Sequence, residues 1–208
     1  MESYYKRDGT ENSGFFYPSD LVHLDSESIV YCIGAGEDII HDLEVLEKLN
    51  SNVYIADPTP RAIQHIKMIK EYYETKIIPE FKNEPSYRQV GGGIGWENFW
   101  NKIKNIKVDP NKINFIDKAI SDKSCTQNFY FPDREEYVSH SLDADMRDTG
   151  NDFISVEVIT LNEMMNIYGH KNIDLLLVDV GGVEKNIIDD ICCRGIFPKY
   201  LAIDFDRS

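Results

Sequence analysis

The most informative stretch of this chain is Tyr31-Cys-Ile-Gly-Ala-Gly-Glu-Asp38, which Asp57 follows twenty-one residues after Gly36. The apolar run at 28–33 predicts a strand that enters the Gly-x-Gly turn, and the amphipathic residues after the turn predict a helix. A second apolar run, Val53-Tyr-Ile-Ala56, predicts a strand that ends in an acid. Strand, glycine turn, helix, strand and acid are the layout of a nucleoside-binding half of a doubly wound sheet. A carboxylate at this strand tip can accept hydrogen bonds from two ribose hydroxyls.

The start of the helix after the glycines indicates which nucleoside fits. A dinucleotide fingerprint has a third glycine where this chain has Ile39, and it places a pyrophosphate at the helix N-terminus. Glu37 and Asp38 occupy that N-terminus and would repel a pyrophosphate. They suit a ligand that has no phosphate and a positive centre, such as S-adenosylmethionine. The alternative is that Asp38 only caps the helix and Glu37 only complements its dipole.

Length and composition indicate one globular domain, with 208 residues, 42% hydrophobic and 28% charged. The net charge of -14 argues against nucleic acid or an anionic membrane as a partner, because no basic patch offsets it. No apolar run is long enough to span a bilayer, and the polar N-terminus is unlike a signal peptide. No metal-binding spacing is visible, so we expect no metal site. Reduced thiols and a cytoplasmic protein are predicted from the four cysteines, Cys32, Cys125, Cys192 and Cys193.

Local signals predict further strands and helices in alternation. Thr59 and Pro60 suit the N-cap and first position of a helix, and Thr160 with Glu163 makes a capping box for another. The continuous apolar run 173–179 predicts a strand covered by helices on both faces. The remaining predicted elements are strands at 113–116, 127–131, 154–159 and 200–205, and a helix with Ile187, Ile188 and Ile191 that stops at Gly195.

The least regular stretch of the sequence is 79–112. Gly91-Gly-Gly-Ile-Gly95 predicts a flexible turn, and Trp96, Phe99 and Trp100 follow it at helical spacing. These aromatic residues predict a short helix docked on the core. The alternative is a lid or acceptor wall hinged at the glycines.

Six short motifs follow one another along the chain. They are Ile33-Gly-Ala-Gly-Glu-Asp38, Ala56-Asp-Pro-Thr-Pro60, Ala119-Ile-Ser-Asp122, Val138-Ser-His-Ser141, Ile159-Thr-Leu161 and Asp174-Leu-Leu-Leu-Val-Asp-Val-Gly-Gly-Val-Glu184. In this order they resemble the FkbM-like methyltransferases, class I S-adenosylmethionine-dependent enzymes that often O-methylate sugars or natural products. The resemblance implies an α/β fold, with a doubly wound, mostly parallel, Rossmann-like sheet in a methyltransferase-like domain at 21–208. The polar residues 1–20 predict a flexible N-terminal arm before it.

The resemblance also implies which residues form the site. Those implied to bind the cofactor are Gly34, Ala35, Gly36 and Glu37 at the turn, Asp57 at the ribose, Lys118, Ala119 and Ile120 at the adenine, and Asp179 beside the methyl group. Ser139, His140 and Ser141 would face the acceptor. Asp179 and His140 are the candidate catalytic bases for a hydroxyl acceptor, with Glu184 third. The alternatives are that Asp179 orients the amino group of the cofactor, that His140 is a hydrogen-bonded loop histidine, and that Glu184 caps its helix.

The chain departs from the family pattern at three places. Cys32 stands where the strand often carries an acid, and Gly181 replaces a carboxylate. The sequence stops at Ser208, after the fifth parallel strand, so we expect the C-terminal antiparallel strands of the full fold to be missing. Either the sequence is a piece of a longer protein, or the protein is a shortened and inactive relative.

Three functions are therefore open. The first is an S-adenosylmethionine-dependent O-methyltransferase, whose partner is a small-molecule hydroxyl acceptor such as a saccharide. The second is a non-catalytic cofactor-binding protein with a regulatory or partner role, which Gly181 and the missing strands support. The third is a dehydrogenase-like nucleotide binder, which Ile39 and the acidic helix start oppose.

Overall fold

A five-stranded sheet forms the centre of the computed structural model, which describes residues 5–7, 15–18, 23–79, 95–132, 140–144 and 149–205. Its strands are β3 (Ile29–Ile33), β4 (Asn52–Ala56), β5 (Ile113–Ile116), β9 (Leu175–Asp179) and β10 (Tyr200–Asp204). They are ordered β10-β9-β3-β4-β5 and all neighbours are parallel. The order reverses beside β3, which makes the junction of β3 and β9 the topological switch point. The predicted doubly wound α/β fold is confirmed.

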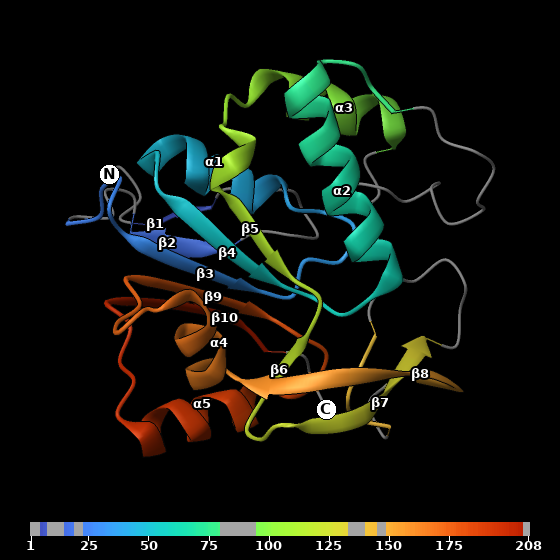
Figure 1. Ribbon diagram of the computed structural model, residues 1–208, viewed down its shortest axis with the longest axis vertical. Helices are drawn as coiled ribbons and strands as arrows, with labels where there is room; N and C mark the ends of the chain where they lie inside the picture. The colour runs from blue at the N-terminus through green and yellow to red at the C-terminus, as the bar shows by residue number, and fades with distance from the viewer. Residues whose placement is uncertain are drawn as a thin grey trace.

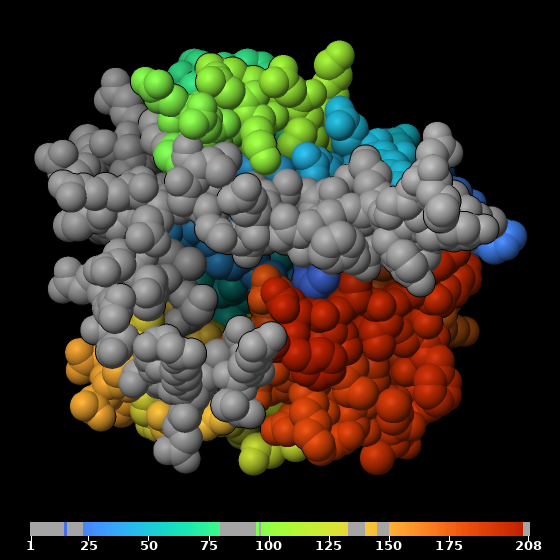
Figure 2. All heavy atoms as spheres, turned by 180° about the vertical axis from the view of Figure 1, so that it is seen from behind, coloured from blue at the N-terminus to red at the C-terminus, as the bar shows by residue number. Residues whose placement is uncertain are grey.

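Helices cover both faces of this sheet, as Figure 1 shows. On one face lie α1 (Ile40–Leu49), α2 (Pro60–Thr75) and α3 (Trp96–Asn105), and on the other lie α4 (Leu161–Tyr168) and α5 (Glu184–Arg194). Alternate residues of β3 enter the two cores, Val30 and Cys32 on the first face and Tyr31 and Ile33 on the second. Seen from behind, α3 in green and the red C-terminal part of the chain lie at opposite ends of the molecule (Figure 2).

A second, three-stranded sheet lies beside α4 and α5 (Figure 1). It consists of β6 (Ala119–Ser121), β7 (Cys125–Pro132) and β8 (Thr149–Thr160), in the order β6-β8-β7. The runs predicted as strands at 127–131 and 154–159 fall within β7 and β8. The sequence did not predict β6, because three residues are too few to show a periodicity.

Two short strands lie in the stretch where the sequence predicts an N-terminal arm. Strand β1 (Tyr5–Arg7) pairs with β2 (Phe16–Pro18) in an antiparallel manner. The ring of Phe15 lies 5.3 Å from that of His41 in α1 and packs against the core on that face. The flexibility of the arm stays a prediction.

Most of the local signals for helix ends and docking are confirmed. The Thr59 side chain accepts a hydrogen bond from the Ala62 N–H at the start of α2, and α5 stops at Gly195 in the left-handed conformation. Helix α3 docks through the buried rings of Phe99 and Trp100, and a 3₁₀ turn (Pro110–Lys112) precedes β5. Residues 91–94 of the predicted glycine turn lie outside the described residues.

No helix within the described ranges is long and apolar enough to cross a membrane. The four cysteines all belong to these ranges and form no disulfide. Cys32 is buried, whereas Cys192 and Cys193 are exposed.

The capping box of α4 provides a test of the local signals. Thr160 and Glu163 bond each other's backbone N–H groups. We expect Thr160→Ala to destabilise the protein by about 1 kcal/mol, which lowers Tm by roughly 2–4 °C, because the N–H of Glu163 loses its acceptor. Thr160→Ser is the matched control, since it keeps the hydroxyl and removes only the methyl group. Equal Tm values for the two variants in thermal unfolding would contradict a role for the hydroxyl.

Candidate functional site

A narrow cavity lies at the switch point, where the carboxyl ends of β3, β4 and β9 approach β6. Four residues predicted to bind the cofactor line it: Gly34, Asp57, Ala119 and Ile120. The rest of the wall is mostly apolar and consists of Ile33, Ala56, Pro58, Phe129, Leu142, Val180, Gly181 and Val183. The volume is about 30 Å³, which is room for little more than a water molecule. The fold therefore brings these residues together but leaves little space among them.

The carboxylate of Asp57 holds the glycine turn. Its Oδ2 accepts hydrogen bonds from the backbone N–H groups of Ala35 and Gly36, both at 2.9 Å. Its Oδ1 accepts from the backbone N–H of Thr59 at 2.8 Å and from the Thr59 hydroxyl at 2.7 Å. The residue is only 7% exposed. Thr59 in turn caps α2, so a continuous chain of hydrogen bonds joins the turn after β3 to the helix after β4.

An ion pair makes a second connection between the same two segments. Arg61, in the first turn of α2, donates from Nε to Oε1 of Glu37 at 2.7 Å and from NH2 to Oε2 at 2.5 Å. The Glu37 side chain is only 2% exposed. Such a two-pronged guanidinium–carboxylate pair is both strong and geometrically specific. Glu37, one of the two acids that the sequence assigned to a cationic ligand, is therefore neutralised within the protein.

Gly34 lies against the backbone at the end of β9. Its φ is +89°, and a Cβ atom built on it would lie 1.8 Å from the carbonyl oxygen of Asp179. A side chain cannot occupy that space, and its backbone conformation is unfavourable for any other residue type. The sequence explained this glycine by close approach of a ligand. The structure shows that the close neighbour is the strand that carries Asp179.

Hydrogen bonds from neighbouring segments also hold the turn after β9, at Gly181 and Gly182. The Ser141 hydroxyl donates to the carbonyl of Gly181 at 2.5 Å, and Ser141 also pairs with the backbone of Tyr130 in β7. The carboxylate of Glu184, at the start of α5, accepts from the N–H of Gly182 at 2.9 Å. Ser141, expected to face the acceptor, thus fastens the small sheet to the turn beside Asp179.

His140 lies among aromatic rings of β7. Its ring is stacked on Phe129 with centroids 5.7 Å apart and stands at a steep angle to Phe131 at 4.7 Å. The residue is only 7% exposed, although the sequence placed it in a hydrophilic segment. Phe129 is the member of this group that lines the cavity. The catalytic role of His140 stays a prediction, as does that of Asp179.

Two further predicted residues lie away from the cavity or outside the described part. The ammonium group of Lys118 forms an ion pair with Glu157 of β8, in the small sheet. Ser139 lies outside the described residues. Within the described ranges no group of three His, Cys, Asp or Glu side chains could hold a metal ion.

The sequence matches the methyltransferase FkbM domain over residues 8–197, which include β3, β4, β5 and β9 of the main sheet. The chain belongs to the FkbM methyltransferase family. No curated protein and no solved structure matches it. The resemblance inferred from the six motifs is confirmed, and the chain is a methyltransferase by family.

In this FkbM methyltransferase a buried acid lies beside Cys32 of β3. The side chain of Asp42, in α1, hydrogen-bonds that of Cys32. Burial raises the pKa of Asp42 to about 6, an effect that the hydrogen bond to Cys32 opposes and the charge of Asp38 reinforces. Burial also raises the pKa of the Cys32 thiol. No local signal in the sequence indicated this contact between α1 and β3.

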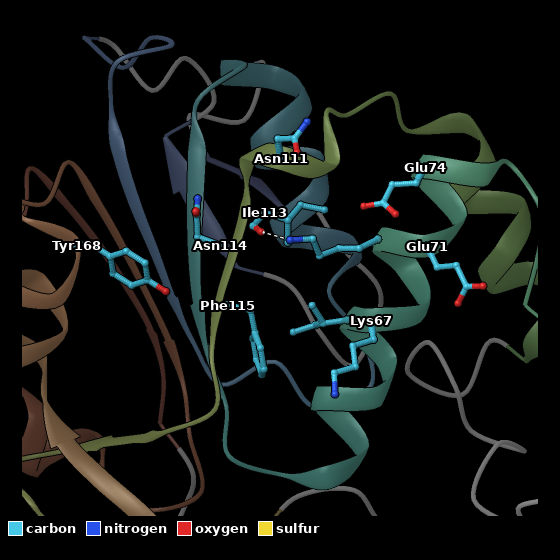
Figure 3. Close-up of a pocket in the computed structure, with 10 residues that line it drawn as sticks. Lys67, Glu71, Glu74, Asn111, Ile113, Asn114, Phe115 and Tyr168 are labelled. Atoms are coloured by element: carbon cyan, nitrogen blue, oxygen red, sulfur yellow. Dashed lines mark hydrogen bonds between the residues drawn. The ribbon is translucent and has the colours of Figure 1, made fainter.

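A wider pocket of about 610 Å³ lies elsewhere in this methyltransferase, between α2 and the outer edge of β5 (Figure 3). Glu71 and Glu74 line it from α2, and Tyr168 lies across the edge of the sheet. The Lys70 ammonium donates to the outward carbonyl of Ile113 at 3.0 Å. A lysine at this position protects an edge strand from pairing with another chain. The residues that line this pocket include none of those predicted to bind the cofactor.

Sequence reasoning missed the partners of the predicted acids. Thr59 was recognised as a helix cap but not as a donor to Asp57, and Arg61 was not considered as the partner of Glu37. One local signal existed for the first contact, because an Asp two residues before a Thr commonly accepts from that residue's N–H. The second contact joins side chains from two different helix starts, so it had no signal in either segment alone.

We expect Gly34→Ala to destabilise the enzyme by more than about 3 kcal/mol, because its Cβ meets the Asp179 carbonyl in addition to the strained backbone. Gly169→Ala is the matched control. Gly169 also has a positive φ, +75°, but no atom lies within 4 Å of a Cβ there, so we expect only about 1–2 kcal/mol. Urea unfolding measures both. Similar costs for the two variants would contradict the close packing of Gly34 on β9.

The buried Asp42 predicts a pH dependence of stability. Its folded pKa of about 6 lies above the ordinary value of 3.8, so the folded state holds this proton more tightly than the unfolded state. Asp42 contributes about 2–3 kcal/mol to the free energy of unfolding below pH 4. This contribution is lost as pH rises through 6. We expect Asp42→Asn to gain stability relative to the parent between pH 5 and pH 8. Urea unfolding at both pH values measures this, with exposed Glu74→Gln as the control, and an unchanged difference would refute it.

Proposed function

We propose that this FkbM methyltransferase transfers a methyl group from S-adenosylmethionine to a hydroxyl group of a saccharide or small natural product. The observation that carries the proposal is the cavity at the switch point. Ligands of open α/β sheets bind at this place, and residues that the family resemblance assigns to the cofactor converge there from β3, β4 and β6. The free cysteines support a cytoplasmic location.

The cavity fits an adenosine in its chemistry but not in its present volume. Apolar side chains such as Ile120, Phe129 and Val183 suit the faces of an adenine ring. Pockets that hold small molecules measure roughly 300–1,000 Å³, so binding must widen a space of about 30 Å³. Gly34, Ala119 and Ile120 would form the walls around the nucleoside.

For methyl transfer to a hydroxyl group, the protein must chiefly position the acceptor and provide a base. S-adenosylmethionine, when bound, supplies an electrophilic methyl carbon. Holding the acceptor oxygen in line with it is worth up to roughly 7–11 kcal/mol. A base that takes the hydroxyl proton adds roughly 10²–10⁴-fold. We assign that role to Asp179, which ends β9 at the carboxyl edge, or to the imidazole of His140.

A non-catalytic cofactor-binding protein is the second candidate. It is favoured by the narrow cavity and by the commitment of Asp57 and Glu37 to contacts within the protein. A site of this kind binds weakly or only after rearrangement. A regulatory or partner role would then use the fold without turnover.

Calorimetric titration and a transfer assay test these proposals together. We expect S-adenosylmethionine and S-adenosylhomocysteine to bind, and NAD not to bind. Transfer of a labelled methyl group to a panel of hydroxyl acceptors should fall at least tenfold in Asp179→Asn. The exposed Asp189→Asn, on α5, is the control. Binding without transfer to any acceptor would favour the non-catalytic candidate, and preferential binding of NAD would refute both.

A further inference from the structure

We propose that the hydroxyl group of Ser141 controls how the cavity at the switch point opens for the cofactor. Its hydrogen bond to the carbonyl of Gly181 holds two walls of the cavity together. This bond breaks when a nucleoside enters. The inference rests on the proposed function, because it concerns the same cavity. It goes beyond that function by naming the contact that keeps the ligand-free space at about 30 Å³.

The walls of the cavity belong to two different sheets. The main sheet and the turns after its strands provide one wall, which includes Gly34 and Gly181. The small sheet and the segment beside β7 provide the other wall, which includes Ile120, Phe129 and Leu142. The room for a nucleoside therefore depends on how far apart these two walls lie.

The wall of the main sheet is held too closely to yield. Strand β3 is hydrogen-bonded to β4 on one side and to β9 on the other. At the end of β3, a Cβ atom on Gly34 would lie 1.8 Å from the carbonyl oxygen of Asp179, so these two backbones are in contact. Helices cover both faces of this sheet, and close-packed interiors resist displacement. The widening must therefore come from the wall of the small sheet.

Ser141 lies where the two walls meet. Its backbone N–H and carbonyl exchange hydrogen bonds with Tyr130 of β7, at 3.1 and 2.8 Å, so its backbone belongs to the wall of the small sheet. Its hydroxyl donates to the carbonyl of Gly181 at 2.5 Å and accepts from the Asp143 N–H at 2.9 Å. The next residue, Leu142, lines the cavity. The hydroxyl therefore fastens the two walls directly beside the space that must widen.

This fastening is small enough for a ligand to open. Ser141 and Gly181 form an isolated β-bridge and not a ladder of several residues. The turn after β9 also has a support of its own, because the carboxylate of Glu184 accepts from the N–H of Gly182. Loss of the Ser141 hydroxyl therefore releases the wall of the small sheet without releasing this turn.

The size of the effect follows from the strength of one hydrogen bond. Such a bond shifts an equilibrium by roughly three- to tenfold. A ligand that binds only the open form has an apparent affinity reduced by the fraction of protein that is open. Removal of the Ser141 hydroxyl raises that fraction and so tightens cofactor binding. A hydroxyl that only supports the fold, or that contacts the bound cofactor, would have no effect or the opposite one.

The first test is calorimetric titration of S-adenosylhomocysteine into the full chain, at a temperature where each variant is folded. We expect Ser141→Ala to bind this ligand about three- to tenfold more tightly than the parent. Ser141→Thr keeps the hydroxyl, and Thr160→Ala removes a buried hydroxyl at the end of β8 that does not line the cavity. We expect both controls to stay within about twofold of the parent.

The second test locks the same contact. Ser141→Cys and Gly181→Cys together place two thiols across the bridge, where neighbouring strands lie about 4.8 Å apart, within reach of a disulfide. Oxidised glutathione converts the two thiols to a disulfide, which mass spectrometry verifies. We expect the disulfide to weaken binding of S-adenosylhomocysteine at least tenfold, and reduction to restore it. The parent, oxidised and reduced in the same way, controls for its own four cysteines.

Equal or weaker binding by Ser141→Ala would overturn the inference, as would the same gain in Ser141→Thr. Equal affinity of the oxidised and reduced double variant would also overturn it, and this comparison decides if Ser141→Ala does not fold. Where the parent binds in these cases, the proposed function stands. If neither the parent nor Ser141→Ala binds S-adenosylhomocysteine, the proposed function fails and the inference fails with it.

Discussion

The buried carboxylate of Asp57 is the interaction on which the rest of the site depends. It accepts two hydrogen bonds from the glycine turn after β3 and two from the residue that caps α2. A buried charge is tolerated only when it is hydrogen-bonded or paired, and here four donors meet that requirement. The turn and the helix N-terminus are therefore fixed relative to each other before any ligand arrives.

Close backbone packing fixes the third side of the site. Gly34 meets the carbonyl of Asp179, so the ends of β3 and β9 approach more closely than any side chain would allow. Ser141 fastens the next turn of the chain to the small sheet through the carbonyl of Gly181. Asp179, the candidate catalytic carboxylate, thus ends a strand that neighbouring segments hold from two directions.

Several charged side chains near the site of this methyltransferase form ion pairs with other side chains of the protein. Glu37 is paired with Arg61, and Lys118 is paired with Glu157. Burial raises the pKa of Asp42, and its hydrogen bond to the Cys32 thiol opposes that rise. The net charge of -14 therefore does not translate into an open acidic pocket at the switch point, and the cavity wall is largely apolar.

The sequence by itself determined the family and the strands and helices of the main sheet, because periodicity, helix caps and glycine turns are signals within short segments. It also named four residues that line the cavity, since parallel strands bring their carboxyl ends to one edge. Only the tertiary structure decided the partners of these residues. Asp57 and Glu37 find donors more than twenty residues away, and His140 is buried between rings of β7. A side chain's role depends on neighbours that meet only on folding, so the same acid can be a ligand or a structural support.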